Sequence, residues 1–255
     1  MREAAIFSPA RSAAGILAGF FAALAAAFAS LSAVAEQPPI VVVGDLHGDY
    51  DAYLTILGNA GLVDARGKWS GGDTILVQLG DLPDRGPDTK KIIEHLMKLE
   101  KQAAKKAGRV EALIGNHEAM MVTGDLRFVT PEEFAAFATS KSRRLRDAYF
   151  SANAGAFSAR YRSKNPALTD AEVRSAFEAD TPLGWVEHRQ AWAPSGELGG
   201  WVASHDALLK LGDTLFVHGG LGAAYAAKPI DQLNEEVRAA LKARGGAVLE
   251  DETGP

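Results

Sequence analysis

The sequence predicts an α/β fold in which a central β-sheet is flanked by helices. Short apolar segments alternate with segments of helical periodicity along the first part of the chain after residue 35. Four apolar segments run directly into turns that are rich in Gly, Asp, Asn and His. Because α/β sheets place their sites beyond the carboxyl ends of the strands, these turns predict a site at one edge of the sheet.

The first strand and the two helices after it have clear boundary signals. Residues 40–43 are apolar and predict a short buried strand. Asp49 is placed to cap a helix that Gly61 ends. Pro87 opens the next helix, whose apolar residues form one stripe, and Gly108 ends it. The alternation of strands and helices predicts helices on both faces of the sheet.

The pattern changes to helix after helix between residues 119 and 201. The segment Thr130-Pro131-Glu132-Glu133 is a strong helix start, and residues 141–161 predict a basic helix. The segment Thr169-Asp170-Ala171-Glu172 resembles a capping box only loosely. We therefore expect a helical cap between the third and fourth turns, which either shapes a substrate groove or is an ordinary surface subdomain.

Composition sets limits on the class of protein. A chain of 255 residues with 47% hydrophobic content can bury one good-sized core, so one domain is expected after the leader. The formal net charge is -5 and no basic run is longer than the Lys105-Lys106 pair, which argues against a nucleic-acid partner. No cysteine is present, so packing and bound metal have to stabilise the fold without disulfides.

The first 35 residues differ sharply in composition from the rest. Arg2 and Arg11 precede a run, residues 13–31, of almost only Ala, Leu, Phe and Gly, and residues 33–35 form a small-x-small cleavage pattern. This predicts a signal peptide over 1–35 and a periplasmic or secreted protein without stable membrane association after cleavage. The alternative is a membrane anchor, since the run approaches the roughly 20 residues that span a bilayer.

The four turns carry residue types that bind divalent metal ions. Carboxylate, imidazole and amide oxygen are hard or borderline ligands, so four turns that meet at one edge can hold two ions a few ångströms apart. In chain order the turns are Gly44-Asp45-Leu46-His47-Gly48, Gly80-Asp81-Leu82-Pro83-Asp84-Arg85-Gly86, Gly115-Asn116-His117-Glu118 and His218-Gly219-Gly220.

In this order the motifs resemble those of the phosphoprotein phosphatases among the calcineurin-like metallophosphoesterases. The bacterial Shewanella-like phosphatases are the nearest match, judged by residues 215–221 and the long segment before them. The resemblance implies a β-sandwich flanked by helices, with the helical insertion between the third and fourth turns. It also implies hydrolysis of phosphate esters on a protein, a peptide or a small molecule, by direct attack of a hydroxide that bridges two metal ions. Manganese is the expected metal, with iron and zinc as alternatives.

The resemblance assigns metal ligands to five residues of this chain. The first ion would take Asp45, His47 and a bridging Asp81. The second would take Asp81, Asn116 and His218.

It also assigns residues to the substrate and to proton transfer. Arg85 and Asn116 would bind the phosphate, and His117 would be the general acid, oriented by Asp84. We interpret Glu118 as a residue that stiffens this site. Among the other histidines, His95 is expected to be solvated, and His188 and His205 to have no functional role.

One departure from the family pattern concerns the second ion. The family has a further His, and a second Arg, downstream of the fourth turn, but no His follows His218 here. We therefore expect the catalytic domain, residues 36–255, to be C-terminally incomplete, with one tight and one weak metal site and little activity. The alternative is a natural variant in which water or His205 fills the position.

Two other functions stay open at this point. Bacterial diadenosine tetraphosphatases share the first two motifs, but they carry Gly-Asn-His-Asp and His-Ala-Gly, so Glu118 and Gly219 favour the phosphatase. A phospho-ligand-binding protein without turnover would explain the missing ligand. Intact Asp84 and His117 argue against it, because binding alone needs no acid.

Overall fold

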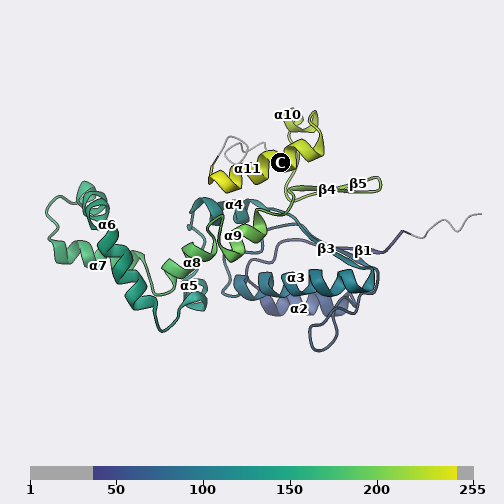
Figure 1. The fold of residues 1–255 in the computed structure, drawn as a ribbon, viewed down its shortest axis with the longest axis horizontal. Coiled ribbons are helices and arrows are strands. Elements are labelled where there is room, and N and C mark those ends of the chain that lie inside the picture. The colour runs from purple at the N-terminus through teal and green to yellow at the C-terminus, as the bar shows by residue number, and fades with distance from the viewer. Residues whose placement is uncertain (1–36, 246–255) are drawn as a thin grey trace, which may run out of the picture. The chain divides into compact units, whose positions relative to one another are not determined.

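The computed structural model describes residues 37–245 (Figure 1). The predicted signal peptide lies outside this range. Among the described residues, no helix combines the length and the apolar character needed to cross a membrane. The described residues from Pro39 onward belong to one compact unit.

Three parallel strands form the main sheet, in the order β1-β2-β3. The strands pair so that Val43, Gln78 and Ala112, their last residues, lie side by side. The turns that follow them therefore begin at the same edge of the sheet. The bounds are β1, Ile40–Val43; β2, Ile75–Gln78; and β3, Arg109–Ala112.

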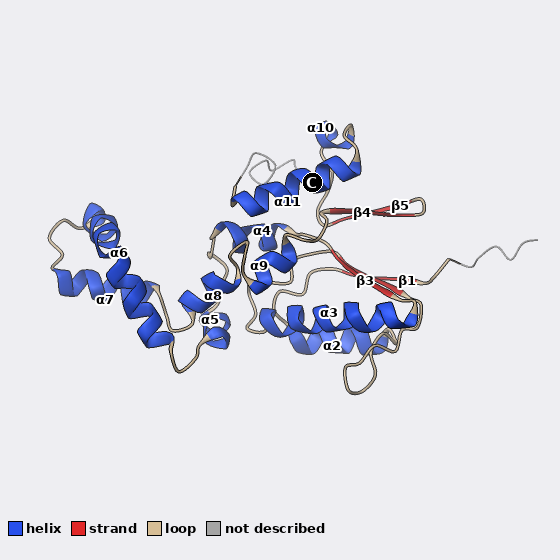
Figure 2. Cartoon of the chain, viewed as in Figure 1, coloured by secondary structure: helices blue, strands red, loops and turns tan. Residues whose placement is uncertain are grey.

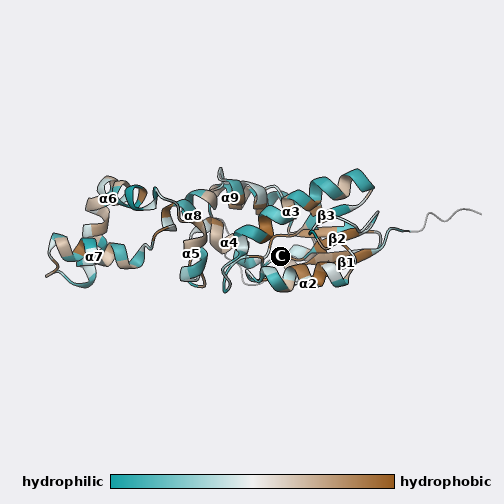
Figure 3. Cartoon of the chain, turned by 90° about the horizontal axis from the view of Figure 1, so that it is seen from below, coloured by the Kyte–Doolittle hydropathy of each residue, from teal (hydrophilic) through white to brown (hydrophobic). Residues whose placement is uncertain are grey.

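Burial along the strands follows their place in the sheet. The central strand β2 is buried along its whole length. In β1, however, Ile40 and Val42 are 38% and 46% exposed, and only Val43 is fully buried. The prediction of a buried first strand is thus wrong for one side of β1. Figure 3 shows hydrophobic residues along the three strands.

Helix α2 (Tyr50–Asn59) returns the chain from β1 to β2. The Asp49 carboxylate accepts a hydrogen bond from the backbone amide of Ala52 at 2.9 Å, so the predicted N-cap is confirmed. Gly61, with φ 72°, follows the last turn in the left-handed conformation that glycine favours.

Helix α3 (Thr89–Ala103) packs against α2 and β3 (Figure 2), and a short 3₁₀ turn, η1 (Ala104–Lys106), follows it. Its predicted apolar stripe is completely buried. The left-handed residue at its end is Ala107, not the expected Gly108. His95 is not solvated as expected, because its Nε2 lies 2.7 Å from the carbonyl oxygen of Gly67 and its ring packs on Tyr53.

Helices fill the segment between the third and fourth turns, as the predicted helical insertion requires. Helix α6 packs against α7 and α8, and it bends at Asn153, whose backbone leaves the helical conformation. Thr169 and Glu172 form both halves of a capping box, a closer match than the sequence indicated. The bounds are α4, Asn116–Thr123; α5, Pro131–Phe137; α6, Ser142–Lys164; α7, Asp170–Asp180; α8, Trp185–Ala191; and α9, Glu197–Val202.

The fourth turn belongs to a different sheet from the first three. Strands β4 (Leu208–Leu211) and β5 (Thr214–Val217) pair antiparallel with each other, and helices α10 (Ala223–Ala226) and α11 (Ile230–Ala243) follow. The expectation that all four turns leave one sheet is therefore wrong. An isolated parallel bridge between Leu113 and Asp206 still connects the chain before β4 to the end of β3.

The buried side chain of Asn234 fixes α11 to the start of β4. Its Oδ1 accepts hydrogen bonds from the amides of Ala207 and Leu208, at 3.0 and 2.9 Å, and its Nδ2 donates to the Leu208 carbonyl. An amide side chain supplies both a donor and an acceptor, which matches the unpaired backbone groups at a strand end. Helix α11 thus fixes the position of the first residues of the β4–β5 hairpin.

The first and second turns touch through two glycines. A Cβ atom at Gly86 would lie 2.3 Å from the carbonyl oxygen of His47 and 2.7 Å from the carbonyl carbon of Gly48. The amides of Leu46 and His47 both donate to the carbonyl of Asp81, at 3.0 Å. Backbone contacts this close exclude any side chain at Gly86, so the motif glycines fix the distance between the two turns.

We expect Gly86→Ala to lower the free energy of unfolding by about 1–3 kcal/mol or more, because an added methyl group in a packed backbone contact forces the turns apart. Urea denaturation measures this change. The matched control is Gly58→Ala in α2, where a Cβ would meet no atom within 4 Å. That variant should gain about 0.5–1 kcal/mol from helix propensity. Equal stability of the two variants would contradict the role assigned to Gly86.

Candidate metal centre

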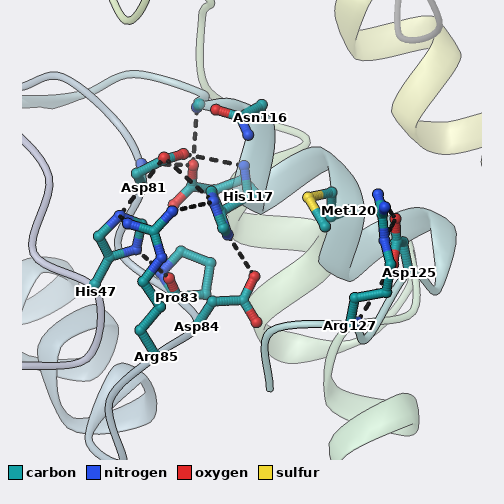
Figure 4. A network of polar contacts seen from close by, with 12 residues as sticks. His47, Asp81, Pro83, Asp84, Arg85, Asn116, His117, Met120, Asp125 and Arg127 are labelled. Atoms are coloured by element: carbon teal, nitrogen blue, oxygen red, sulfur yellow. Dashed lines mark hydrogen bonds and ion pairs between the residues drawn. The ribbon is translucent and has the colours of Figure 1, made fainter. Parts of the chain in front are cut away.

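The carboxylate of Asp81 lies at the middle of the site (Figure 4). Its Oδ2 lies 3.3 Å from Nε2 of His218, 3.7 Å from Nε2 of His117 and 3.9 Å from Nε2 of His47. Its Oδ1 accepts a hydrogen bond from the backbone amide of His117 at 3.0 Å. The first, third and fourth turns thus each direct an imidazole toward the Asp81 carboxylate, which belongs to the second turn.

Hydrogen bonds orient two of these imidazoles. Nδ1 of His47 lies 3.0 Å from the carbonyl oxygen of Pro83, and Nδ1 of His218 lies 3.0 Å from that of Leu79. A carbonyl oxygen only accepts, so Nδ1 carries the proton in both rings and Nε2 faces Asp81. Metal-binding histidines commonly have this arrangement, with a backbone carbonyl fixing the nitrogen that does not bind the ion.

His117 is oriented by a carboxylate instead. Its Nδ1 lies 2.5 Å from Oδ2 of Asp84, and both side chains are almost completely buried. Burial raises the pKa of Asp84, while the hydrogen bond to His117 opposes that shift. In this pair the carboxylate accepts the proton on Nδ1, which fixes the tautomer of the imidazole, and Nε2 faces the site. This arrangement is typical of a histidine that acts as a general acid or base.

Electrostatics couple Asp81 to His218. Burial tends to raise the pKa of Asp81, but the hydrogen bond from His218 and the backbone amide of His117 outweigh it, so the pKa is lowered. The same hydrogen bond raises the pKa of His218 to about 9, against desolvation. Because a histidine must lose its proton to bind a metal, protons and metal ions compete for His218.

Asp45 and Asn116 complete the set of oxygen donors. The Asp45 side chain is half exposed; its Oδ2 lies 3.6 Å from Nε2 of His47, and its Oδ1 lies 3.9 Å from Nδ1 of His218. Oδ1 of Asn116 lies 3.0 Å from Nε2 of His218. Both side chains therefore place oxygen atoms next to imidazoles that face Asp81.

The donor atoms fall into two groups that share Asp81. One contains His47, Asp81 and His117, and the other contains Asp45, Asp81 and His218, with the ligand atoms of each within 4.8 Å of one another. This donor set fits two divalent ions bridged by one carboxylate. His117 falls in the first group, so distance alone does not separate a ligand role from the predicted acid role.

Arg85 places a positive charge on the open side of these donors. Its Nη1 lies 2.7 Å from Nε2 of His47 and its Nη2 lies 3.4 Å from Nε2 of His117. The guanidinium carbon lies 5.9 Å from the ring centre of Phe128. The backbone carbonyl of Phe128 accepts a hydrogen bond from the backbone amide of Arg85. Arg85 is exposed and can therefore meet an anion that enters from solvent.

The backbone is strained at the residues that form the site. Among the described residues, six other than glycine have positive φ, and four of these lie in the first two turns. Such conformations cost of order 1–3 kcal/mol each and persist only where the surroundings impose them. The four are His47 (45°), Asp81 (56°), Asp84 (72°) and Arg85 (65°).

Glu118 connects the second and third turns. Its buried Oε2 accepts hydrogen bonds from the amides of Asp81 and Gly115, at 2.9 and 2.8 Å, and its Oε1 accepts from Leu82 at 2.8 Å. Burial raises its pKa, with the charge of Asp81 adding to the shift and the three amides opposing it. These contacts agree with the stiffening role expected for Glu118.

The structure brings all eight predicted site residues together, and their individual roles stay predictions. Sequence reasoning missed Phe128, for which no motif gave a signal. It also missed that Glu133 and His188 are completely buried, with Oε1 of Glu133 3.6 Å from Nε2 of His188. The sequence pointed away from Glu133, because its position in a helix start predicts a capping role.

Histidines and carboxylates follow the ends of parallel strands, and an exposed arginine lies next to them. These features define a metal-binding α/β protein whose site can also bind an anion. The chain belongs to the calcineurin-like phosphoesterase family, which matches residues 38–249. The predicted α/β class and the predicted family are confirmed.

Two curated relatives are named as Shewanella-like protein phosphatases. Shewanella-like protein phosphatase 2 of Arabidopsis thaliana is 33% identical over 213 residues, which is 80% of this chain and 52% of the relative. Shewanella-like protein phosphatase 1 of Plasmodium berghei is 39% identical over 98 residues, 38% of this chain and 27% of the relative. The chain thus spans about half the length of the Arabidopsis relative.

A solved structure shows the same fold. The cold-active protein-tyrosine phosphatase of a psychrophilic Shewanella species superposes with a TM-score of 0.59 at 23% identity, covering 86% of this chain and 56% of that one. At this identity the likeness concerns the fold and not the substrate.

We expect Glu118→Gln to lower the free energy of unfolding by about 1–3 kcal/mol although the side chains have the same shape. Both carboxylate oxygens accept amide protons, so either orientation of the glutamine directs its NH₂ group at a donor. Urea denaturation measures the loss. The control is Glu132→Gln, on the exposed side of α5. An unchanged denaturation midpoint for Glu118→Gln would show that these hydrogen bonds contribute little.

Proposed function

We propose that this protein is a metal-dependent phosphomonoesterase of the serine/threonine protein phosphatase-like type, acting on a phosphorylated protein, peptide or small phosphoester. The observation that carries the proposal is the position of Asp81, between two groups of metal donors that Arg85 borders. Atoms that can bind cations and a guanidinium that can bind a phosphoryl anion thus lie next to each other. Membership of the phosphoesterase family and the phosphatase relatives support this reaction class.

The metal ligands we propose are those that the motifs assign. Asp45, His47 and Asp81 would bind one divalent ion, and Asp81, Asn116 and His218 the other. Bound there, the ions would lower the pKa of a water molecule and neutralise phosphoryl oxygens. The set contains oxygen and imidazole donors without a thiolate, which suits manganese and accommodates iron or zinc.

Arg85 and Asn116 would bind the phosphoryl group. The Arg85 guanidinium presents several N–H donors in one plane, and the ring of Phe128 restricts its direction. The side-chain oxygen of Asn116 faces His218. The NH₂ group of the same side chain could therefore donate a hydrogen bond to a phosphoryl oxygen. Together these groups would orient the ester and stabilise charge that develops on its oxygens.

His117 would donate the proton that the leaving oxygen needs. Asp84 accepts from Nδ1, so the other nitrogen, Nε2, faces the site. The adjacent carboxylate also stabilises the imidazolium before it gives up its proton. A proton delivered from Nε2 avoids the formation of a strongly basic alkoxide when the phosphate ester of an alcohol is cleaved.

We expect Asp81→Asn and His117→Asn to separate metal binding from turnover. Asp81→Asn should lose metal at both sites, because its charge serves both ions. His117→Asn should retain its metal and lower kcat by about 10²- to 10⁴-fold, the range of general acid catalysis. Elemental analysis and turnover of phosphate esters with manganese measure the two properties. Metal loss in His117→Asn would make His117 a ligand, and undiminished turnover of all esters would refute the acid role.

We also propose that residues 1–35 are removed as a signal peptide and that the protein is periplasmic or secreted. The charged start, the apolar run and the small-x-small pattern support this proposal. The exported protein should begin at Glu36, and intact-mass analysis of the secreted or periplasmic fraction measures this. A chain that keeps Met1 and stays with the membrane would contradict export with cleavage.

A further inference from the structure

A cavity of about 510 Å³ opens in the helical insertion, and none of the residues of the proposed reaction lines it. Its volume lies within the roughly 300–1,000 Å³ of pockets that bind ligands. Two charged residues, Arg160 and Asp180, line it, and the loop after α4 contributes Gly124 and Leu126. Aromatic residues of α5, α6 and α8 form most of the rest of the lining: Phe134, Tyr149, Phe157, Tyr161 and Trp185.

The aromatic wall of this cavity is oriented by its own packing. Phe157 packs on the fully buried Phe177, with ring centres 4.6 Å apart. Tyr149 packs on Trp185 and on Phe157, with ring centres 5.5 and 6.0 Å apart. Tyr149 is still 37% exposed, and Trp185 is partly exposed. Because rings that are already oriented lose little freedom on binding, an apolar group that covers them gains most of the free energy of burial.

The cavity also has a hydrogen-bond donor and an acceptor at exposed positions. Arg160 and Asp180 are both exposed, and both line the cavity. The guanidinium carbon of Arg160 lies 5.8 Å from the ring centre of Tyr161, and Oδ2 of Asp180 accepts a hydrogen bond from the Tyr161 hydroxyl at 2.8 Å. A guanidinium donates several hydrogen bonds and a carboxylate accepts several. The two side chains can therefore bind both the C=O and the N–H groups of a polypeptide backbone, which suits a peptide better than a purely apolar ligand.

A short segment of chain connects the cavity to the proposed phosphate site. Leu126 lines the cavity, and two Cα–Cα steps, at most about 7.6 Å, separate it from Phe128. The ring centre of Phe128 lies 5.3 Å from that of His117 and 5.9 Å from the guanidinium carbon of Arg85. The nearest wall of the cavity is therefore roughly 10–15 Å from the His117 ring, which an extended chain spans with about 3–5 residues. Arg127 and Phe128 are exposed, so a bound chain can lie over them.

We propose that this cavity binds a bulky apolar side chain of a phosphorylated polypeptide substrate, about 3–5 residues from the phosphorylated residue. Residues 126–128 connect the cavity to the phosphate site, so one extended chain can occupy both places. The aromatic wall buries the side chain, while Arg160 and Asp180 bind the backbone next to it. The inference rests on the proposed function, because it requires the phosphoryl group to lie at Arg85.

The test is a scan of phosphopeptides with manganese present. All peptides share one polar sequence around a phosphorylated residue; a single tryptophan occupies each position on either side in turn, and the reference peptide has alanine instead. For one position, about 3–5 residues from the phosphorylated residue, kcat/KM should exceed the reference value about tenfold or more, as expected when one large apolar side chain is buried. Turnover of p-nitrophenyl phosphate, which is too small to reach the cavity, measures the chemistry separately.

Variants of the aromatic wall assign the preference to the cavity. Tyr149→Ala should lower the preference for the tryptophan peptide about threefold or more and leave turnover of p-nitrophenyl phosphate within about threefold of the original value. The matched control is Ile56→Ala in α2, which removes a similarly exposed apolar side chain, 40% against 37%, that does not line the cavity. It should keep the full preference. If Tyr149→Ala does not fold, Trp185→Leu shortens the same wall, keeps an apolar residue at the start of α8 and should show the same loss.

The outcomes separate this inference from the proposed function. If p-nitrophenyl phosphate is turned over but no tryptophan position is preferred, or if the preference survives in both Tyr149→Ala and Trp185→Leu, the cavity does not bind the substrate. A dimer in solution that Tyr149→Ala dissociates would assign the cavity to a second copy of the chain and overturn the inference as well. If neither p-nitrophenyl phosphate nor any phosphopeptide is turned over with manganese, the proposed function fails, and the inference about the cavity fails with it.

Discussion

The geometry of the site depends on Asp81, a residue of the second turn that contacts the other three turns through different atoms. Its carbonyl accepts the amides of Leu46 and His47, and its own amide donates to Glu118. Its two carboxylate oxygens reach the amide of His117 and the ring of His218. These contacts explain why Asp81 keeps a left-handed backbone conformation, although this conformation costs of order 1–3 kcal/mol of stability. A residue fixed at every polar atom is well suited to bridge two ions, because its carboxylate does not have to reorganise.

The sheet supplies the coarse position of the turns, and polar contacts supply the fine position. Parallel register brings the ends of β1, β2 and β3 together. The backbone contact between Gly48 and Gly86 sets the distance between the first and second turns. The three hydrogen bonds that Glu118 accepts from backbone amides set the distance between the second and third turns. The fourth turn comes from a separate hairpin, and the bridge at Asp206 and the Asn234 side chain fix where that hairpin starts. The position of His218 therefore depends on the C-terminal part of the described chain more than the positions of the other candidate ligands do.

Sequence reasoning was most successful where short-range chemistry decides the outcome. The motifs identified the eight residues that meet at the site, and the cap at Asp49 was predicted because an N-cap is a local feature. It failed where tertiary packing decides. Glu133 and Glu172 occupy the same position after a capping threonine, yet Glu172 caps its helix and Glu133 is buried next to His188. The open side of β1 and the separate hairpin also depend on partners far along the chain, which local patterns do not specify.

The metal donors and the proposed acid are parts of one hydrogen-bonded network. The backbone of His117 donates to Asp81, and the ring of the same residue binds Asp84. A displacement of Asp81 would therefore move the acid as well as the ions. The segment before α5 contains Phe128, whose backbone carbonyl accepts a hydrogen bond from the backbone amide of Arg85, the residue proposed to bind the phosphate. The helical insertion thus contacts the site through Phe128, in the loop that precedes α5.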